Sequence, residues 1–284
     1  MAGKNSQQAA PDRPEIASSV ITGDFKTNYH DVGSGDPILL IHGSGPGVTA
    51  WSNWNKVFPL LGDSFRLLVP DMAGFGYTER IPGVVNTMNS WVQQVVDFLD
   101  AMTVDKVHLI GNSFGGAVAL AMTVLHPERI DKLVLMGTAG ISFPITYGLD
   151  RVWGYEPSLE NMEELLHIFT YDHAFATPDL IRSRFEGSIQ PGFHESFSSM
   201  FPEPRQRWVD WMAAYEHYIH DIQNDTLLVH GLQDRVIPVE NSMKLLTMIP
   251  NSQLHVFGKC GHWTQIEHTV EFCDLVRDFL QYER

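Results

Sequence analysis

The segment that most restricts the possible folds of this chain is Gly111-Asn112-Ser113-Phe114-Gly115, near the middle of the sequence. It follows directly after the apolar run Val107–Ile110 and leads into an alanine-rich stretch that starts at Ala117. The run before it has the composition of a buried strand, and the stretch after it that of a helix. Glycines on both sides of Ser113 let the backbone turn tightly, so the hydroxyl projects from the turn. The motif therefore predicts a strand–turn–helix unit with a serine at its apex; in a simpler interpretation, Ser113 only caps the helix.

Short apolar runs alternate with helix-like segments along most of the chain. The strand-like runs are Pro37–Ile41, Arg66–Val69, Lys106–Ile110, Lys132–Met136, Thr226–His230 and Gln253–Phe257. The helix-like segments are Ser90–Met102, Phe114–Leu125, Glu240–Met248 and Glu267–Tyr282. Unbroken apolar strands separated by helices are typical of a parallel sheet with both faces covered. We therefore expect an α/β, doubly wound, mostly parallel sheet, with antiparallel strands near Ser19–Ile21 and Phe25–His30 at one edge.

One stretch interrupts this alternation. Residues 143–223 contain many aromatic residues and no strand pattern, and their helical pieces are Leu159–Phe169, Pro178–Ser188 and Arg205–Ile222. An all-helical insertion of about eighty residues is too long for a loop. Because ligands of α/β sheets bind at the C-terminal ends of the strands, we expect this insertion to cover that edge as a cap. The predicted organisation is a disordered tail at residues 1–16, a core at residues 17–142 and 224–284, and a helical cap at residues 143–223.

The composition excludes several classes of protein. A formal net charge of −15 is unsuited to binding a nucleic-acid backbone, and it would repel an anionic substrate unless a local cation were present. No apolar run approaches the roughly 18 residues of a membrane helix, and the N-terminal segment lacks the apolar core of a signal peptide. The two cysteines, Cys260 and Cys273, make no disulfide framework, which favours a cytoplasmic protein. Cys260 lies two residues before His262, but a small buried apolar residue is its simpler interpretation.

A serine hydroxyl needs a base, and the base needs a third group that fixes its tautomer. Asp234 lies just past the strand-like run 227–231, and His262 lies just past the run 254–257. Serine, then acid, then histidine, each on a loop after a strand, is the order that accompanies this type of serine motif. Asp71, after an earlier strand, is the rival acid, whereas Asp225 precedes its strand and lies at the wrong end of the sheet. We therefore predict that Ser113, Asp234 and His262 form a catalytic triad.

A glycine-rich segment after the run 37–41 is expected to complete the site. The sequence His42-Gly43-Ser44-Gly45-Pro46-Gly47 can bring backbone N–H groups close to the serine. We expect the N–H of Phe114 and the N–H of Ser44, or that of Gly43 one residue earlier, to form an oxyanion hole. A plain strand-to-helix loop is the alternative.

Six longer segments are more specific than the triad motifs. They are HGSGPGVTAWSNW, PDMAGFGYTER, GNSFGG, GTAGISFPITYGLDRVWGYEPS, PGFHESFSSMFPEPRQRW and HVFGKCGHWTQIEH. Together they resemble the meta-cleavage-product hydrolases, which have an α/β-hydrolase fold and break carbon–carbon bonds in bacterial aromatic degradation. The resemblance extends from about Asn28 to Leu280. The SFPIT and RQRW segments resemble the branch of the 2-hydroxymuconate-semialdehyde hydrolases, which releases small acyl groups, more than the biphenyl branch.

The resemblance implies further site residues. Asn53 and Asn112 match positions that bind the keto or enol oxygen and the carboxylate of the substrate, and Gly43 is grouped with them. Arg184 on the cap matches the residue that pairs with the carboxylate, and Trp263 matches an aromatic residue of the same pocket. The simpler alternatives are a solvated charge for Arg184, a helix cap for Asn53 and plain packing for Trp263. Candidates for the acyl pocket are Trp153, Trp208, Val209 and Val236.

The reaction implied by the resemblance is hydrolysis of a carbon–carbon bond in a 2-hydroxy-6-oxo-2,4-dienoate, such as 2-hydroxymuconate semialdehyde or a small 6-alkyl analogue. The products would be 2-hydroxypenta-2,4-dienoate and a short carboxylic acid, formed without a metal or an organic cofactor. We expect a homo-oligomer, a dimer or a tetramer, that binds neither nucleic acid nor membrane. The alternatives are a hydrolase for a larger, isopropyl-type substituent, a general carboxylesterase, and a non-catalytic small-molecule receptor on the same fold.

Overall fold

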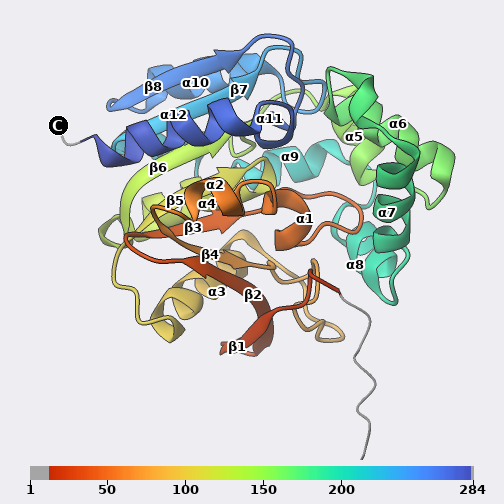
Figure 1. The fold of residues 1–284 in the computed structure, drawn as a ribbon, viewed down its shortest axis with the longest axis horizontal. Helices are drawn as coiled ribbons and strands as arrows, with labels where there is room; N and C mark the ends of the chain where they lie inside the picture. Colours follow the sequence, from red (N-terminus) through yellow and green to blue (C-terminus); the bar gives the residue numbers. More distant parts are fainter. Residues whose placement is uncertain (1–12, 283–284) are drawn as a thin grey trace, which may run out of the picture.

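The computed structural model describes residues 13–282, and these residues form one eight-stranded sheet with the strand order β1-β2-β4-β3-β5-β6-β7-β8 (Figure 1). The strands are β1 (Ser18–Thr22), β2 (Phe25–Gly33), β3 (Pro37–Ile41), β4 (Arg66–Pro70), β5 (Val107–Asn112), β6 (Ile130–Met136), β7 (Thr226–Gly231) and β8 (Ser252–Phe257). β2 pairs antiparallel with both β1 and β4, and every other pair of neighbours is parallel. The predicted α/β, mostly parallel sheet with an antiparallel edge is confirmed.

Helices cover both faces of this sheet (Figure 1). The α-helices are α1 (Ala50–Trp54), α2 (Phe58–Leu61), α3 (Met88–Ala101), α4 (Phe114–Leu125), α5 (Tyr147–Trp153), α6 (Leu159–Phe169), α7 (Pro178–Ser188), α8 (Phe193–Met200), α9 (Gln206–Met212), α10 (Val239–Met248), α11 (Thr264–Glu267) and α12 (Thr269–Gln281). Leu39 and Ile41 of β3 belong to the core on the side of α3 and α4. Ile38 and Leu40 belong to the core on the side of α1, α2 and α12. This alternation is the two-residue period of a strand buried on both faces.

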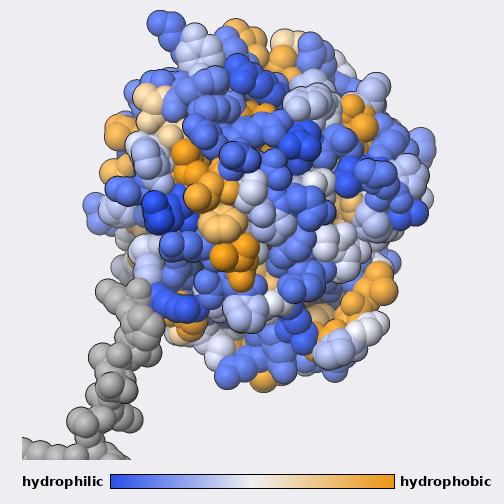
Figure 2. Space-filling view, turned by 90° about the vertical axis from the view of Figure 1, so that its right-hand side faces the viewer, coloured by the Kyte–Doolittle hydropathy of each residue, from blue (hydrophilic) through white to orange (hydrophobic). Residues whose placement is uncertain are grey.

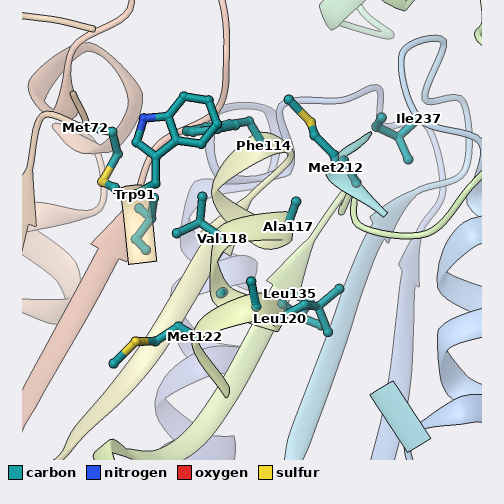
Figure 3. Packing of buried hydrophobic residues seen from close by; sticks show 14 of the residues in the cluster. Met72, Trp91, Phe114, Ala117, Val118, Leu120, Met122, Leu135, Met212 and Ile237 are labelled. Carbon is teal, nitrogen blue, oxygen red and sulfur yellow. The ribbon is translucent and has the colours of Figure 1, made fainter. Parts of the chain in front are cut away.

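Helix α4 is buried along most of its length and supports the turn at Ser113. Figure 3 shows Val118 and Leu120 of α4 among the apolar side chains of this core, with the Trp91 ring next to Phe114 at the start of the helix. The Trp91 and Phe114 ring centroids lie 4.6 Å apart in an edge-on arrangement. Because the interior is close-packed, the start of α4 cannot shift without disturbing these neighbours.

The cap lies at the C-terminal edge of the sheet. β6 ends at Met136 and β7 begins at Thr226, and helices α5 to α9 lie between them. Two contacts join the cap to loops that follow strands. Trp153 Nε1 of α5 donates to Ser44 Oγ after β3 at 3.1 Å, and the carbonyl of Phe169 accepts the N–H of His262 after β8 at 2.7 Å. The insertion therefore covers the edge at which ligands of α/β sheets bind.

The surface on the cap side is mainly hydrophilic, with apolar residues in small groups (Figure 2). Among residues 13–282, no helix combines the length and the apolar composition that crossing a bilayer would require.

Three details of the helices differ from the prediction. The predicted helix Arg205–Ile222 ends at Met212, and a short 3-10 helix, Glu216–Asp221, follows. Between these two helices the Tyr215 hydroxyl donates to Asn89 Oδ1 of α3 at 2.5 Å. The predicted helix Glu267–Tyr282 is interrupted at His268, whose φ is −127°, so that it becomes α11 and α12. Helix α8 was not predicted; it begins after Gly192, whose φ of +79° favours glycine.

The predicted disordered tail is wrong for its last residues. Residues 1–12 lie outside the described part of the chain. At residues 13–16 the chain forms a turn in which the Ile16 N–H donates to the Arg13 carbonyl at 3.1 Å. Arg13 Nη1 also donates to Gln190 Oε1 of the cap at 3.1 Å. These contacts attach residues 13–16 to the folded domain.

Candidate active site

Ser113 lies at the junction of β5 and α4 in a conformation that is rare for a residue with a side chain. Its φ is +55° and its ψ is −113°. A Cβ on Gly111 would lie 2.4 Å from the Gly115 carbonyl, and one on Gly115 would lie 2.4 Å from the Ile41 carbonyl. Only glycines therefore allow this turn. The Ser113 side chain makes no capping hydrogen bond to α4, so the simpler interpretation of Ser113 as a helix cap is wrong.

Asp234 and His262, from the loops after β7 and β8, are paired. His262 Nδ1 lies 2.7 Å from Asp234 Oδ2. Asp234 Oδ1 accepts the backbone N–H groups of Val236 at 2.7 Å and Ile237 at 3.0 Å, which fixes the carboxylate. Burial alone would raise the pKa of Asp234, but the neighbouring His262 and His230 side chains hold that pKa below its usual range. The carboxylate is therefore ionised at neutral pH and can orient the imidazole.

The rival acid Asp71 has a different environment. Its carboxylate accepts the backbone N–H groups of Ala50 at 2.5 Å and Tyr77 at 2.7 Å, and the side-chain amide of Asn28 at 2.8 Å. These hydrogen bonds lower the pKa of Asp71, but burial outweighs them and raises it to about 6. Asp71 thus holds the start of α1 and the loop after β4, and the structure pairs His262 with Asp234 instead.

Gly43 and Ser44, in the loop after β3, differ in whether their backbone N–H groups are already engaged. The Gly43 N–H donates to Asn53 Oδ1 at 3.3 Å. Within residues 13–282, no hydrogen-bond acceptor engages the N–H of Ser44 or that of Phe114. The His42 ring holds the turn, since its Nδ1 lies 2.8 Å from the Gly43 carbonyl and its Nε2 accepts the Met72 N–H at 3.0 Å. Burial lowers the pKa of His42 to about 4, so this ring is neutral. The arrangement favours Ser44 over Gly43 as the second donor to an oxyanion.

The residues implied by the family resemblance line one cavity together with Ser113 and His262. This cavity includes Asn53, Asn112, Arg184 and Trp263. Asn53 Nδ2 donates to Asn112 Oδ1 at 3.3 Å, and Asn53 lies inside α1, whose N-cap is Thr49. The helix-cap interpretation of Asn53 is therefore wrong.

Arg184 reaches from α7 of the cap into this cavity. Its Nη2 donates to the Ser52 carbonyl at 2.6 Å, and its guanidinium carbon lies 5.2 Å from the centre of the Trp263 ring. No Asp or Glu forms an ion pair with it among the residues that the structure describes. Burial lowers the pKa of Arg184 to about 10, so the guanidinium is still charged at neutral pH. Glu15 acts on this charge only from beyond ion-pair distance. A half-buried cation without a salt-bridge partner is suited to binding a carboxylate.

Three cavity residues on α6 were not predicted. Met162, Leu166 and Phe169 have the spacing of one helix face and line the cavity. The Phe169 ring stacks on Trp263 with centroids 4.7 Å apart. An apolar stripe on a helix was the available signal, but such a stripe indicates core packing equally well. The cavity has a volume of about 40 Å³.

The four acyl-pocket candidates lie in different places. Trp153 contacts Ser44, as described above, and its ring stacks on Phe201 with centroids 4.6 Å apart. Val236 is buried directly beside Asp234, and Val209 is buried in the same large core. None of the four lines the Ser113 cavity. Trp208 lines a separate cavity of about 310 Å³ whose wall includes Phe201. The Trp208 ring lies there because its Nε1 donates to the Pro202 carbonyl at 2.7 Å.

Two further polar residues near the triad were also not predicted. Glu267 Oε1 accepts the Gly261 N–H, and Glu267 Oε2 accepts the Tyr171 N–H, each at 2.7 Å. Glu267 thereby joins the loop that carries His262 to the end of α6. His230 is fully buried, and its Nε2 lies 3.3 Å from Asp234 Oδ2. Sequence offers little signal for either, because both depend on contacts between distant segments.

The cysteines have no reactive character. Cys260 and Cys273 are free and buried. Burial raises the pKa of Cys260 above its ordinary value and that of Cys273 to about 12. Both remain thiols at neutral pH, and Cys260 takes no part in the chemistry of the site.

Comparisons with known proteins agree with this architecture. The model of the α/β hydrolase fold family matches residues 36–269. A 2-hydroxymuconate semialdehyde hydrolase of Pseudomonas sp. strain CF600 is 52% identical over 272 residues, which cover 96% of this chain and 96% of that protein. A 2-hydroxy-6-oxo-2,4-heptadienoate hydrolase of Pseudomonas putida strain F1 is 52% identical over 269 residues, covering 95% and 98%. Among solved structures, a mutant of the meta-cleavage product hydrolase CumD from Pseudomonas fluorescens IP01, complexed with acetates, has a TM-score of 0.93 at 50% identity and covers 94% of this chain and 98% of that one.

Proposed function

The chain belongs to the α/β-hydrolase fold family and, within it, to the meta-cleavage product hydrolases, and on this premise we propose that it hydrolyses a 2-hydroxy-6-oxo-2,4-dienoate. The bond broken joins C5 and C6, and the products are 2-hydroxypenta-2,4-dienoate and a short carboxylic acid. One observation carries the assignment of residues. Ser113, His262 and the unpaired guanidinium of Arg184 line the same cavity, and Asp234 is hydrogen-bonded to His262.

In the first proposed step, the substrate carboxylate binds Arg184 and the 2-hydroxy group lies against Asn112. A guanidinium can hold a carboxylate through two parallel hydrogen bonds, which fixes the register of the diene. The positive charge and the Trp263 ring stabilise the dienolate while a proton moves from the 2-hydroxyl oxygen to C5. The product of this step is a 2,6-diketone, whose conjugated ketone can accept an electron pair.

In the second step, Ser113 Oγ attacks the C6 carbonyl and His262 takes its proton. The oxyanion that forms accepts hydrogen bonds from the N–H groups of Phe114 and Ser44. Neither N–H has another acceptor among the described residues. The C5–C6 bond then breaks, its electron pair passes into the conjugated ketone, and protonation of the resulting enolate gives 2-hydroxypenta-2,4-dienoate. A water molecule activated by His262 hydrolyses the acyl-enzyme and releases the acid.

A small C6 substituent, hydrogen or methyl, is part of this proposal. The narrow cavity at Ser113 supports it, since a large acyl group would require more side chains to move. Trp153 and Val236 remain our candidates for the acyl pocket, because Trp153 bonds Ser44 and Val236 bonds Asp234. Val209 is retained only as a buried residue of the cap. An esterase or a non-catalytic receptor would have no use for Arg184, so neither alternative accounts for this cavity as well.

The remaining proposals concern the setting of the reaction. We place the enzyme in the cytoplasm, because both cysteines are free thiols and a reducing compartment keeps them so. We also propose that it forms a homo-oligomer, a dimer or a tetramer. The molar mass in solution, measured by light scattering during gel filtration, tests this directly; a mass equal to one chain would contradict it.

The test of the proposed function follows the loss of dienolate absorbance with substrates that carry hydrogen, methyl, isopropyl or phenyl at C6. We expect the highest kcat/KM for hydrogen or methyl. Ser113→Ala should lower turnover about 10³-fold or more, because the triad members act as a unit, while still binding the dienoate. Near-normal turnover in this variant would exclude Ser113 as the nucleophile. Hydrolysis of simple esters with no dienoate activity in the wild type would exclude the proposed reaction.

A further inference from the structure

A second cavity adjoins the Ser113 cavity at Arg184. It has a volume of about 350 Å³ and lies between α1 and the segment of the cap that leads into α7. Asn53 and Arg184 line both cavities. The remaining wall includes Lys56 and the apolar side chains of Phe175, Leu180 and Ile266.

The charge in this second cavity is positive. Lys56 is exposed at the end of α1, and its Nζ lies 5.6 Å from the centre of the Phe175 ring. Neither Lys56 nor Arg184 forms an ion pair with an Asp or Glu in the described part of the chain. Two unpaired cations are notable in a chain with a formal net charge of −15. An anion approaching this protein meets a repulsive field almost everywhere, so a cationic opening has a large effect on where it enters.

A third cavity, of about 140 Å³, also touches Arg184 and provides a comparison. Its wall includes the carboxylate of Glu15 and no lysine. A carboxylate beside the opening opposes the approach of an anion. Two cavities thus share Arg184 with the Ser113 cavity. Only the one that contains Lys56 has the positive charge that attracts an anionic substrate.

We propose that the cavity formed by Lys56, Phe175, Leu180 and Arg184 is the entrance through which the anionic substrate reaches Ser113. This inference rests on the proposed function, because it takes the substrate to be a conjugated carboxylate. Lys56 attracts the carboxylate, the apolar wall accepts the flat diene, and the carboxylate then passes to Arg184. Lys56 is suited to this transient contact because its ammonium is a flexible, well-hydrated point charge.

The proposal makes Lys56 important for association and unimportant for chemistry, since it does not line the Ser113 cavity. We expect Lys56→Gln to lower kcat/KM for the dienoate about 3- to 10-fold at low ionic strength, and Lys56→Glu to lower it further. Both losses should shrink to within about twofold at 0.5 M salt, where the Debye length is only about 4 Å. The kcat of both variants should stay within about twofold of the wild type. Lys26→Gln is the matched control, because Lys26 is an exposed lysine on β2 that lines none of these cavities.

The deciding measurement is the association rate constant of the dienoate with Ser113→Ala, alone and combined with each lysine substitution, by stopped-flow absorbance at several salt concentrations. The entrance is supported if salt lowers the association rate more, or raises it less, when Lys56 is intact than when Lys56→Glu is also present. The proposal would be overturned if the Lys56 variants associated with the dienoate as fast as the Lys26→Gln control. It would also be overturned if their loss of kcat/KM persisted at high salt together with a lower kcat. If the wild type does not hydrolyse the dienoate at all, the proposed function fails instead, so the two failures are distinguishable.

Discussion

At the scale of single residues, the backbone of Ser113, the proposed nucleophile, already has its unusual conformation without a substrate. Its positive φ of +55° costs on the order of 1–3 kcal/mol for a residue other than glycine. Hydrogen bonds on both sides maintain it: the Ser113 N–H donates to the Met136 carbonyl at 2.9 Å, and the Ser113 carbonyl accepts the Gly116 N–H at 3.0 Å. Because the side chain is not used to cap α4, the hydroxyl is available to a substrate.

The two buried carboxylates near the site should respond differently to the same substitution. Asp234→Asn should lower kcat about 10²- to 10⁴-fold, since an amide no longer stabilises the protonated imidazole or selects its tautomer. Asp71→Asn should keep kcat within about tenfold but reduce the free energy of unfolding by about 1–3 kcal/mol, because one of its three donors loses its acceptor. Steady-state kinetics and urea unfolding of both variants measure these effects. If Asp71→Asn were the more damaging to kcat, Asp234 would not be the acid.

Arg184 should distinguish charged from neutral substrates. Arg184→Gln should lower kcat/KM for the dienoate about 10²-fold, which corresponds to about 2–3 kcal/mol for a charged hydrogen bond. Hydrolysis of a small neutral ester should change only a few-fold, because such an ester has no carboxylate to bind. The comparison requires kcat/KM for both substrates in both proteins. Equal losses on the two substrates would mean that Arg184 supports the structure of the cap.

At the scale of elements, the site depends on loops that the sheet brings together and on the attachment of the cap to them. The loops after β3, β5, β7 and β8 converge because parallel strands end at the same edge. Glu267 at the end of α11 then bonds both the loop before His262 and the segment after α6. A single carboxylate therefore couples the position of His262, the proposed base, to that of the cap.

Glu267→Gln tests this coupling. The amide replaces one of two acceptor oxygens, so at least one backbone N–H loses its partner, at a cost of about 1–3 kcal/mol. We expect kcat to fall about 3- to 10-fold and the midpoint of thermal unfolding to fall by a few °C. Glu271→Gln, at an exposed position on the neighbouring α12, is the control and should change neither value. Identical behaviour of the two variants would show that Glu267 positions nothing.

At the scale of the whole molecule, charge is unevenly distributed. The chain carries a formal net charge of −15, yet the cavities that lead to Ser113 are lined by Arg184 and Lys56. A large net charge keeps a protein soluble but destabilises its compact state through self-repulsion. Attraction of an anionic substrate is therefore local, and it works against the field of the molecule.

This self-repulsion should be visible in thermal unfolding. At pH 8, raising sodium chloride from 10 mM to 300 mM should raise the unfolding midpoint by a few °C, because salt screens the like charges. Differential scanning calorimetry measures the shift. The same experiment near the pH of zero net charge is the control and should show little change. A midpoint that falls with salt at pH 8 would mean that attractive ion pairs outweigh the repulsion.

Local sequence determined the sheet, the order of its strands along the chain and the position of the nucleophile. The strand-like runs at 37–41 and 226–230 coincide with β3 and β7 because unbroken apolar runs in a parallel sheet leave little ambiguity. The predicted helices Leu159–Phe169 and Pro178–Ser188 match α6 and α7. Each begins after a Ser or Thr N-cap, which is a clear signal for the start of a helix.

Tertiary structure decided what depends on contacts between segments far apart in the chain. Sequence order favoured Asp234 over Asp71 as the acid but could not show the pairing. Only the folded chain brings Asp234 Oδ2 to within 2.7 Å of His262, while Asp71 binds the start of α1. Only the docking of α7 on α1 gives Arg184 its place beside Trp263. The hydrophobic period of a sequence indicates which face of a helix or strand is buried. A cavity such as the one beside Lys56 depends on how the faces of two elements pack against each other, and the period of either element does not indicate that.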